Sequence, residues 1–189
     1  MKRIAIFASG AGTNAARIIE YFKGHPSVEV SLVVSNKKDA LVLEKAQKAS
    51  VPILIFNREE LYSSNRVVER LSEQEIDFVV LAGFLWLVPE NLIKAYADKM
   101  INVHPALLPK FGGKGMYGMN VHRAVKEAGE TESGITIHLV NEEYDKGRIL
   151  AQAKCAIEKK DTPETIARKI HALEYANFPH VIEQYILTP

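Results

Sequence analysis

The chain has 189 residues, of which 47% are hydrophobic and 25% are charged. These fractions are typical of one globular α/β domain and exclude a disordered or fibrous protein. The 24 Lys and Arg residues nearly balance the 23 Asp and Glu residues, so overall charge does not indicate binding to nucleic acid or to a membrane.

The N-terminal apolar run reaches Ser9-Gly10 within a few residues, which is too short for a signal peptide or a membrane span. Cys155 is the only cysteine and cannot form an internal disulfide. Its place in the alternating run 149–157 predicts packing in the core. We therefore expect a cytoplasmic protein.

The first half of the chain alternates strands with helices. Apolar runs predict strands, and apolar residues at helical spacing predict helices. The predicted strands are 3–8, 28–34, 53–56 and 78–82, and the predicted helices are 14–23, 41–49 and 59–74. Their short connections indicate right-handed crossovers and a doubly wound, Rossmann-like sheet. Ligands bind such sheets beyond the carboxyl ends of the strands.

The pattern changes after about residue 100. The predicted strands are 100–103, 135–140 and 148–157, with a Pro- and Gly-rich loop at 105–118 and a helix at 121–127. A last helix should begin after Asp161 or Thr162, because either residue can cap it and Pro163 suits its first turn.

We find no internal repeat and no linker. The sequence therefore predicts a single domain over residues 1–189, in which the pattern of elements changes near residue 100.

The Gly-rich loop at 9–14 follows the first predicted strand and opens the first helix. Its glycines permit a tight turn, and free N–H groups at a helix N-terminus favour a phosphate. The loop also fits the loose dinucleotide pattern, but the second strand ends in Ser35-Asn36 without the acid that would hold a ribose. A phosphate site, a structural turn and a dinucleotide site all remain open from the residues alone.

Asn102 and His104 alternate along a predicted strand and should project to the same side. An amide and an imidazole placed together can hold a carbonyl oxygen and handle its proton. Asp145 lies in a turn that ends in Gly147, and its carboxylate could orient and charge His104. The alternatives are a structural Asn–His pair and a solvated Asp in an ordinary turn.

A metal site is not expected, because the sequence has no His-Glu-x-x-His pair and a lone cysteine cannot build a thiolate zinc site. The Gly-rich run 112–115 does not fit a Walker A loop, since Gly115 stands where Ser or Thr is needed. The apolar segment 81–88 suits either the core or a flat heterocycle.

Four segments together resemble the folate-dependent formyltransferase family. They are Ser9-Gly10-x-Gly12-Thr13-Asn14, Leu81-Ala82-Gly83-Phe84, Asn102-Val103-His104-Pro105-Ala106-Leu107-Leu108-Pro109 and Tyr144-Asp145-x-Gly147. The third segment is highly specific for the family, and the first points within it to the glycinamide ribonucleotide formyltransferases. The resemblance covers nearly the whole chain and implies a single-domain Rossmann-like formyltransferase fold, with a mostly parallel twisted sheet and helices on both faces. It also implies a nucleotide-binding-like half at 1–100 and a catalytic and folate-binding half at 101–189.

This resemblance implies transfer of a formyl group from 10-formyltetrahydrofolate to the amine of glycinamide ribonucleotide in purine biosynthesis. It implies small-molecule partners, no metal, no nucleic acid, no membrane, and a monomer or homodimer. The implied catalytic residues are Asn102, His104 and Asp145. The implied ribonucleotide site is Gly12, Thr13, Asn14, His171 and Glu174. The implied folate site is Arg58, Leu85, Trp86, Leu87, Val88 and Asn102, with Arg58 toward the glutamate tail.

The sequence departs from the family in two places. The Gly-rich loop at 111–119 is longer than expected, and Trp86 stands where an Arg is frequent. The second departure should matter little if backbone groups bind the pterin.

Other functions stay open as alternatives. A methionyl-tRNA formyltransferase would need a second, RNA-binding domain, and a formyltetrahydrofolate hydrolase would need a regulatory domain before the first strand. Amino-sugar formyltransferases share the same core. A nicotinamide-dependent oxidoreductase would explain the Gly-rich loop but not the Asn–His–Asp set, and a non-catalytic ligand-binding module would explain only the fold.

Overall fold

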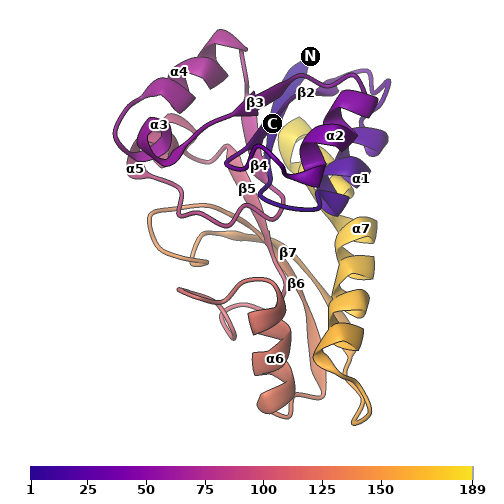
Figure 1. Cartoon of the computed structure of the whole chain (residues 1–189). Helices are drawn as coiled ribbons and strands as arrows, with labels where there is room; N and C mark the ends of the chain where they lie inside the picture. The colour runs from indigo at the N-terminus through magenta and orange to yellow at the C-terminus, as the bar shows by residue number, and fades with distance from the viewer. Residues whose placement is uncertain (189) are drawn as a thin grey trace. The chain divides into compact units, whose positions relative to one another are not determined.

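The computed structural model describes residues 1–188, and its helices and strands are labelled in Figure 1. Backbone contacts divide the chain into two compact units, Met1–Ile101 and Asn102–Thr188. The strand β5, Met100–His104, carries the chain from the first unit into the second. The single-domain organisation of residues 1–189 stays a prediction.

The first unit contains four parallel strands in the order β3-β2-β1-β4. These are β1 (Lys2–Phe7), β2 (Val28–Ser35), β3 (Ile53–Ile55) and β4 (Phe78–Leu81). At the carboxyl end of β1, Phe7 pairs with Val34 on one side and with Leu81 on the other. Continuous apolar runs form these strands because both faces of the sheet are covered.

Five helices cover this sheet. They are α1 (Thr13–Tyr21), α2 (Leu41–Lys48), α3 (Arg58–Tyr62), α4 (Arg66–Glu73) and α5 (Glu90–Ala95). Within the first unit, α1 and α2 lie on one side of the strands and α3, α4 and α5 lie on the other (Figure 1). The sequence analysis assigned no element to the residues of α5.

The prediction of one helix at 59–74 is wrong, because the structure has α3 and α4 there. The break falls at Ser63-Ser64-Asn65. The Ser64 hydroxyl donates to the Glu60 carbonyl at 3.0 Å and accepts from the Arg66 N–H at 3.3 Å. Side chains that bond to nearby backbone groups compete with the helix, so this run of short polar residues ends α3 after five residues.

The second unit contains an antiparallel strand pair and two helices. The strands are β6 (Glu132–Leu139) and β7 (Ile149–Ala156), and the helices are α6 (Met119–Glu127) and α7 (Pro163–Leu187). Helix α7 packs on both strands and contacts α6. It begins as predicted, with Thr162 as cap, Pro163 in the first turn, and the Thr162 and Thr165 side chains each bonding the other's backbone N–H.

Cys155 lies on β7 opposite Ser133 and is only half-buried, so the prediction of core packing for this residue is only partly met. Burial is the main cause that raises the pKa of its thiol above the ordinary value.

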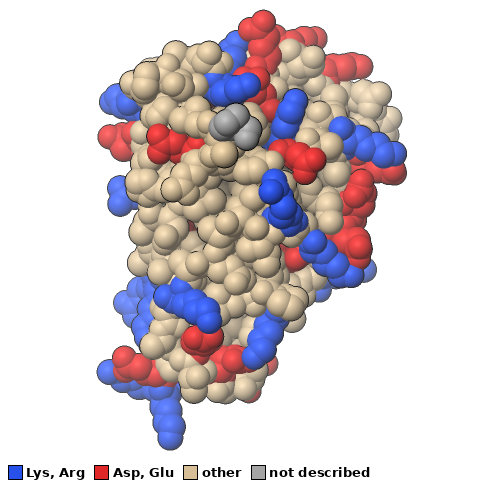
Figure 2. Space-filling view, turned by 180° about the vertical axis from the view of Figure 1, so that it is seen from behind, with Lys and Arg blue, Asp and Glu red and all other residues tan. Residues whose placement is uncertain are grey.

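Two features of the whole described chain concern the expected partners. No helix within residues 1–188 is long and apolar enough to cross a membrane. On the face drawn in Figure 2, acidic and basic side chains are interspersed and do not gather into one field of a single sign.

Candidate active site

The Gly-rich loop of the first unit is shaped by close packing. Gly12 is the N-cap of α1 and has a φ of 63°, in the left-handed region that favours glycine. A Cβ atom at this position would lie 2.4 Å from the Val42 side chain of α2. Gly10, in contrast, has open space around it. The tight turn is therefore required by the fold, whatever the loop binds.

Ser9 joins three segments at the carboxyl ends of the strands. Its hydroxyl donates to the Asn36 side chain at 2.7 Å and accepts from the Leu85 N–H at 3.0 Å. The side chain is buried, and Asn36 follows β2 while Leu85 follows β4. This contact fixes the segment 83–88 beside the Gly-rich loop within the first unit.

The predicted folate segment presents apolar side chains to solvent. Leu85 is 48% exposed and Leu87 is 47% exposed, whereas Val88 is buried. Arg58, from α3, lies against the Trp86 ring with 5.3 Å from its guanidinium carbon to the ring centroid. The structure thus brings Arg58 beside Trp86, although these two predicted folate residues lie far apart in the sequence.

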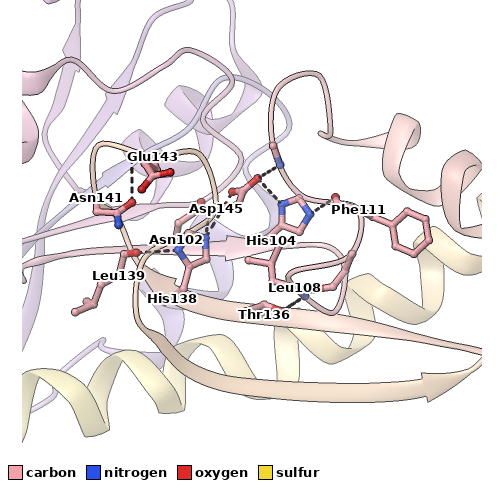
Figure 3. Close-up of polar contacts among 12 residues, drawn as sticks. Asn102, His104, Leu108, Phe111, Thr136, His138, Leu139, Asn141, Glu143 and Asp145 are labelled. Carbon is pink, nitrogen blue, oxygen red and sulfur yellow. Dashed lines mark hydrogen bonds and ion pairs between the residues drawn. The ribbon is translucent and has the colours of Figure 1, made fainter.

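His104 and Asp145 face each other in the second unit (Figure 3). The His104 Nδ1 atom lies 3.6 Å from Asp145 Oδ2, and the His104 side chain is 4% exposed. The other ring nitrogen, Nε2, donates to the Phe111 carbonyl at 2.8 Å. The two ring nitrogens of His104 therefore have different neighbours: Nε2 bonds to a backbone carbonyl, and Nδ1 faces the Asp145 carboxylate.

The Asp145 carboxylate is held by the loop at 111–119 and by its own turn. Its Oδ2 atom accepts a hydrogen bond from the Gly113 N–H at 2.8 Å. A Cβ atom at Gly112 would lie 2.6 Å from Leu108 and 3.3 Å from Asp145, so only glycine fits there without displacement. Asp145 has a φ of 55°, a strained value that Asp tolerates better than most residues.

His138 completes this cluster, although the sequence analysis did not assign it to the site. Its Nδ1 atom donates to the Leu139 carbonyl at 2.8 Å, and its Nε2 atom lies 3.1 Å from the Asn102 amide nitrogen. Burial lowers the pKa of His138, so the ring is neutral and Nε2 accepts from Asn102. Its Nε2 atom also lies 3.7 Å from Asp145 Oδ1. The alternation of Thr136 and His138 along one face of this buried strand was the available signal.

The chain that follows His104 is held in place by β6 and β7. The Thr136 hydroxyl donates to the Ala106 carbonyl at 2.7 Å and accepts from the Leu108 N–H at 2.9 Å. Gln152 adds hydrogen bonds to the same hydroxyl and to the Leu108 carbonyl. This network fixes where the strand β5 ends, and therefore where His104 lies.

The predicted ribonucleotide residues on α7 form a second polar group in the same unit. His171 Nδ1 lies 2.9 Å from Glu174 Oε2, and its hydrogen bond to that carboxylate raises the pKa of His171. The Glu174 side chain is only 6% exposed. The His171 ring also stacks on Tyr175, with 6.1 Å between centroids.

His122, on α6, is a further buried histidine that the sequence analysis did not assign. Its Nδ1 atom has no hydrogen-bond partner among residues 1–188. Burial lowers its pKa to about 4, and the neighbouring charges of His171 and His104 act in the same direction while Glu174 opposes them. His122 therefore interacts electrostatically with His104 of the first cluster and with the His171–Glu174 pair.

The described residues contain no group of three or more His, Cys, Asp or Glu side chains that could hold a metal ion. In the second unit the structure brings Asn102, His104 and Asp145 into one cluster and pairs His171 with Glu174. In the first unit it places the Gly-rich loop beside Leu85 and Arg58 beside Trp86.

Comparison with known proteins gives matches over nearly all of the chain. A Bacillus subtilis phosphoribosylglycinamide formyltransferase is 36% identical over 191 residues, covering 98% of this chain and 95% of the relative. A chloroplastic enzyme of the same name from Arabidopsis thaliana is 43% identical over 187 residues, covering 96% of this chain. The chain spans 64% of the length of that plant relative.

A crystal structure of phosphoribosylglycinamide formyltransferase from Bacillus halodurans superposes with a TM-score of 0.89 and 38% identity, covering 99% of this chain and 96% of that chain. The predicted fold class, a mostly parallel α/β sheet of the formyltransferase kind, is confirmed by this agreement. Residues 2–182 match the family described as formyl transferase. The chain therefore belongs to the formyl transferase family.

Proposed function

We propose that this protein transfers the formyl group of 10-formyltetrahydrofolate to the amine of glycinamide ribonucleotide. The products would be formylglycinamide ribonucleotide and tetrahydrofolate, in purine biosynthesis. The observation that carries the proposal is the buried cluster of Asn102, His104 and Asp145 in a chain of this family. Relatives with the phosphoribosylglycinamide formyltransferase name, matched over most of their length, support the choice of substrate.

The reaction begins when the amine of the ribonucleotide attacks the formyl carbon and the formyl oxygen becomes negatively charged. One N–H of the Asn102 amide bonds to His138, which leaves the second N–H for this oxygen. The His104 side chain lies in the same cluster, and we assign it to stabilise the same negative charge. Loss of one such donor typically costs roughly 10²–10³-fold in rate.

Proton transfer completes the reaction. The attacking amine loses a proton, the bond between the formyl carbon and the folate nitrogen breaks, and that nitrogen gains a proton as tetrahydrofolate leaves. Asp145 faces Nδ1 of His104, and it would take the amine proton through a water molecule and pass this proton on to the folate nitrogen. Acid–base assistance of this kind contributes roughly 10²–10⁴-fold.

Both compact units contribute residues to the proposed substrate binding. We assign the ribonucleotide phosphate and ribose to Gly12, Thr13 and Asn14 of the first unit, and further ribonucleotide contacts to His171 and Glu174 of the second. The pterin is assigned to the backbone of Leu85, Trp86, Leu87 and Val88, and Arg58 to the glutamate tail. We also propose one formyltransferase domain, active in the cytoplasm as a monomer or homodimer.

The test is a direct assay of formyl transfer from 10-formyltetrahydrofolate to glycinamide ribonucleotide, followed by the absorbance of the released folate. A chelator is present throughout, because the proposed reaction uses no metal. We expect transfer in the natural protein and its loss in His104→Ala, with circular dichroism checking that the variant is folded. Slow folate deformylation without transfer, or activity on an amino sugar, would overturn the substrate assignment.

A further inference from the structure

Trp86 lies in a three-residue cluster at the surface of the first unit. The Arg58 guanidinium carbon lies 5.3 Å from the Trp86 ring centroid and 5.5 Å from that of Tyr62. The two rings also contact each other, with 6.2 Å between centroids and an interplanar angle of 33°. Arg58 therefore packs its cation against two aromatic rings at once, which favours a fixed guanidinium position.

The cluster is attached to the proposed pterin segment and to the core. The Tyr62 hydroxyl donates to the Leu87 carbonyl at 2.9 Å, which ties α3 to the segment 85–88. On its other side, Trp86 contacts Phe56 edge to face, with 6.1 Å between centroids, and Phe56 is buried. The position of the Arg58 cation is thus fixed relative to the segment proposed to hold the pterin.

Arg58 has no carboxylate partner among residues 1–188. The nearest acid of its own capping box, Glu60, accepts from the Asn57 N–H and pairs with Arg66 at 3.1 Å. A guanidinium that packs by its face keeps N–H groups at its edge, and these bind a carboxylate in a bidentate way. An exposed, unpaired and oriented guanidinium is suited to an anionic ligand.

We propose that Trp86 and Tyr62 are positioning residues that hold Arg58 as the anchor for a carboxylate of the folate's glutamate tail. This inference rests on the proposed function, because it takes the folate as the ligand of segment 85–88. The inference also gives the Trp86 side chain a role. Its ring supplies the surface that orients Arg58, so the identity of this side chain determines how well the tail is recognised.

The test compares two ligands, tetrahydrofolate and tetrahydropteroate, which lacks the glutamate. Calorimetry gives the dissociation constant of each ligand for the natural protein and for Arg58→Gln, Trp86→Ala, Trp86→Phe and Tyr62→Ala. Arg66→Gln is the matched control, because Arg66 is a neighbouring exposed cation that already has a carboxylate partner. Trp86 is the only tryptophan, so its fluorescence reports ligand binding independently in the variants that retain it.

We expect Arg58→Gln to weaken tetrahydrofolate binding about 10-fold, and Trp86→Ala or Tyr62→Ala to weaken it about 3-fold. Trp86→Phe should keep most of the natural affinity for tetrahydrofolate, and Arg66→Gln should leave this affinity unchanged. Arg58→Gln should leave the affinity for tetrahydropteroate unchanged, whereas Trp86→Ala and Tyr62→Ala should weaken the binding of tetrahydrofolate more than that of tetrahydropteroate. A purely structural role for Trp86 would instead weaken both ligands equally.

Two outcomes separate this inference from the proposed function. If tetrahydrofolate binds but Trp86→Ala affects both ligands equally or neither, the positioning role is wrong and the proposed function stands. If the natural protein binds neither ligand, the folate assignment itself fails, and the positioning role fails with it.

Discussion

The two compact units bury different kinds of polar chemistry. In the first unit the buried polar side chains are serines, at positions 9, 31 and 35. In the second unit they include three histidines and two carboxylates, at positions 104, 122, 138, 161 and 174. Serine costs little to bury when it is hydrogen-bonded, whereas a buried ionisable group must be neutral, paired or strongly hydrogen-bonded.

This difference separates two ways to build a site. The Gly-rich loop of the first unit depends on backbone shape, which Gly12 provides because it lacks a Cβ atom. The second unit depends on side chains whose ring nitrogens and oxygens each have a specific neighbour. Changes in charge should therefore act mainly through the second unit, and changes in side-chain volume should act on the loop of the first.

The largest effect should come from Asp145→Asn. Asn tolerates the left-handed backbone at this position, so the fold should persist while the charge that faces His104 disappears. We expect kcat to fall roughly 10²–10⁴-fold with little change in KM. Glu143→Gln, in the same turn but exposed and paired with Lys146, should leave kcat unchanged. A raised KM with an intact kcat would contradict the assignment of Asp145.

Acidification should destabilise the protein through His122. Its folded-state pKa of about 4 lies below the ordinary value of 6.5, so the unfolded chain binds the proton more strongly. The stabilisation that depends on neutral His122 should be fully present above pH 6.5. The free energy of unfolding should then fall by about 3 kcal/mol as pH is lowered from 6.5 to 4. Urea unfolding of the natural protein and His122→Gln at several pH values measures this. An unchanged pH slope in the variant would refute the prediction.

Gly12→Ala should have an intermediate effect. The added methyl group would meet Val42 and the residue would keep a left-handed φ, so we expect a loss of about 1–3 kcal/mol in the free energy of unfolding. The KM for the ribonucleotide should also rise if the loop binds its phosphate. Gly10→Ala, which meets no atom within 4 Å, is the control. Equal losses in the two variants would rule out the packing explanation.

The smallest effect should come from Ser133→Ala. The Ser133 hydroxyl is buried without a hydrogen-bond partner among residues 1–188, so its removal should leave stability unchanged or raise it by up to about 1 kcal/mol. Thr136→Val, on the same strand, removes a hydroxyl with three hydrogen bonds and should cost about 1–3 kcal/mol. Thermal unfolding of both variants would measure the contrast, and a Ser133→Ala loss as large as that of Thr136→Val would contradict it.

Periodicity located most elements to within two or three residues, because apolar spacing reports which face of each element is buried. It failed at 59–74, where three short polar residues after Tyr62 end the helix through local hydrogen bonds that leave the apolar spacing intact. Alternation along β5 predicted that Asn102 and His104 project to the same side, and in the structure His138, which contacts Asn102, and His104 both lie beside Asp145.

The sequence by itself determined the alternation of strands and helices, the family motifs and the identity of the candidate catalytic residues. Only the tertiary structure decided which ring nitrogen of His104 faces Asp145, that His138 lies between Asn102 and Asp145, and that Trp86 packs against Arg58. The physical reason is distance along the chain. Periodicity reports the burial of an element, whereas these contacts join atoms tens of residues apart or depend on a left-handed turn such as that at Asp145.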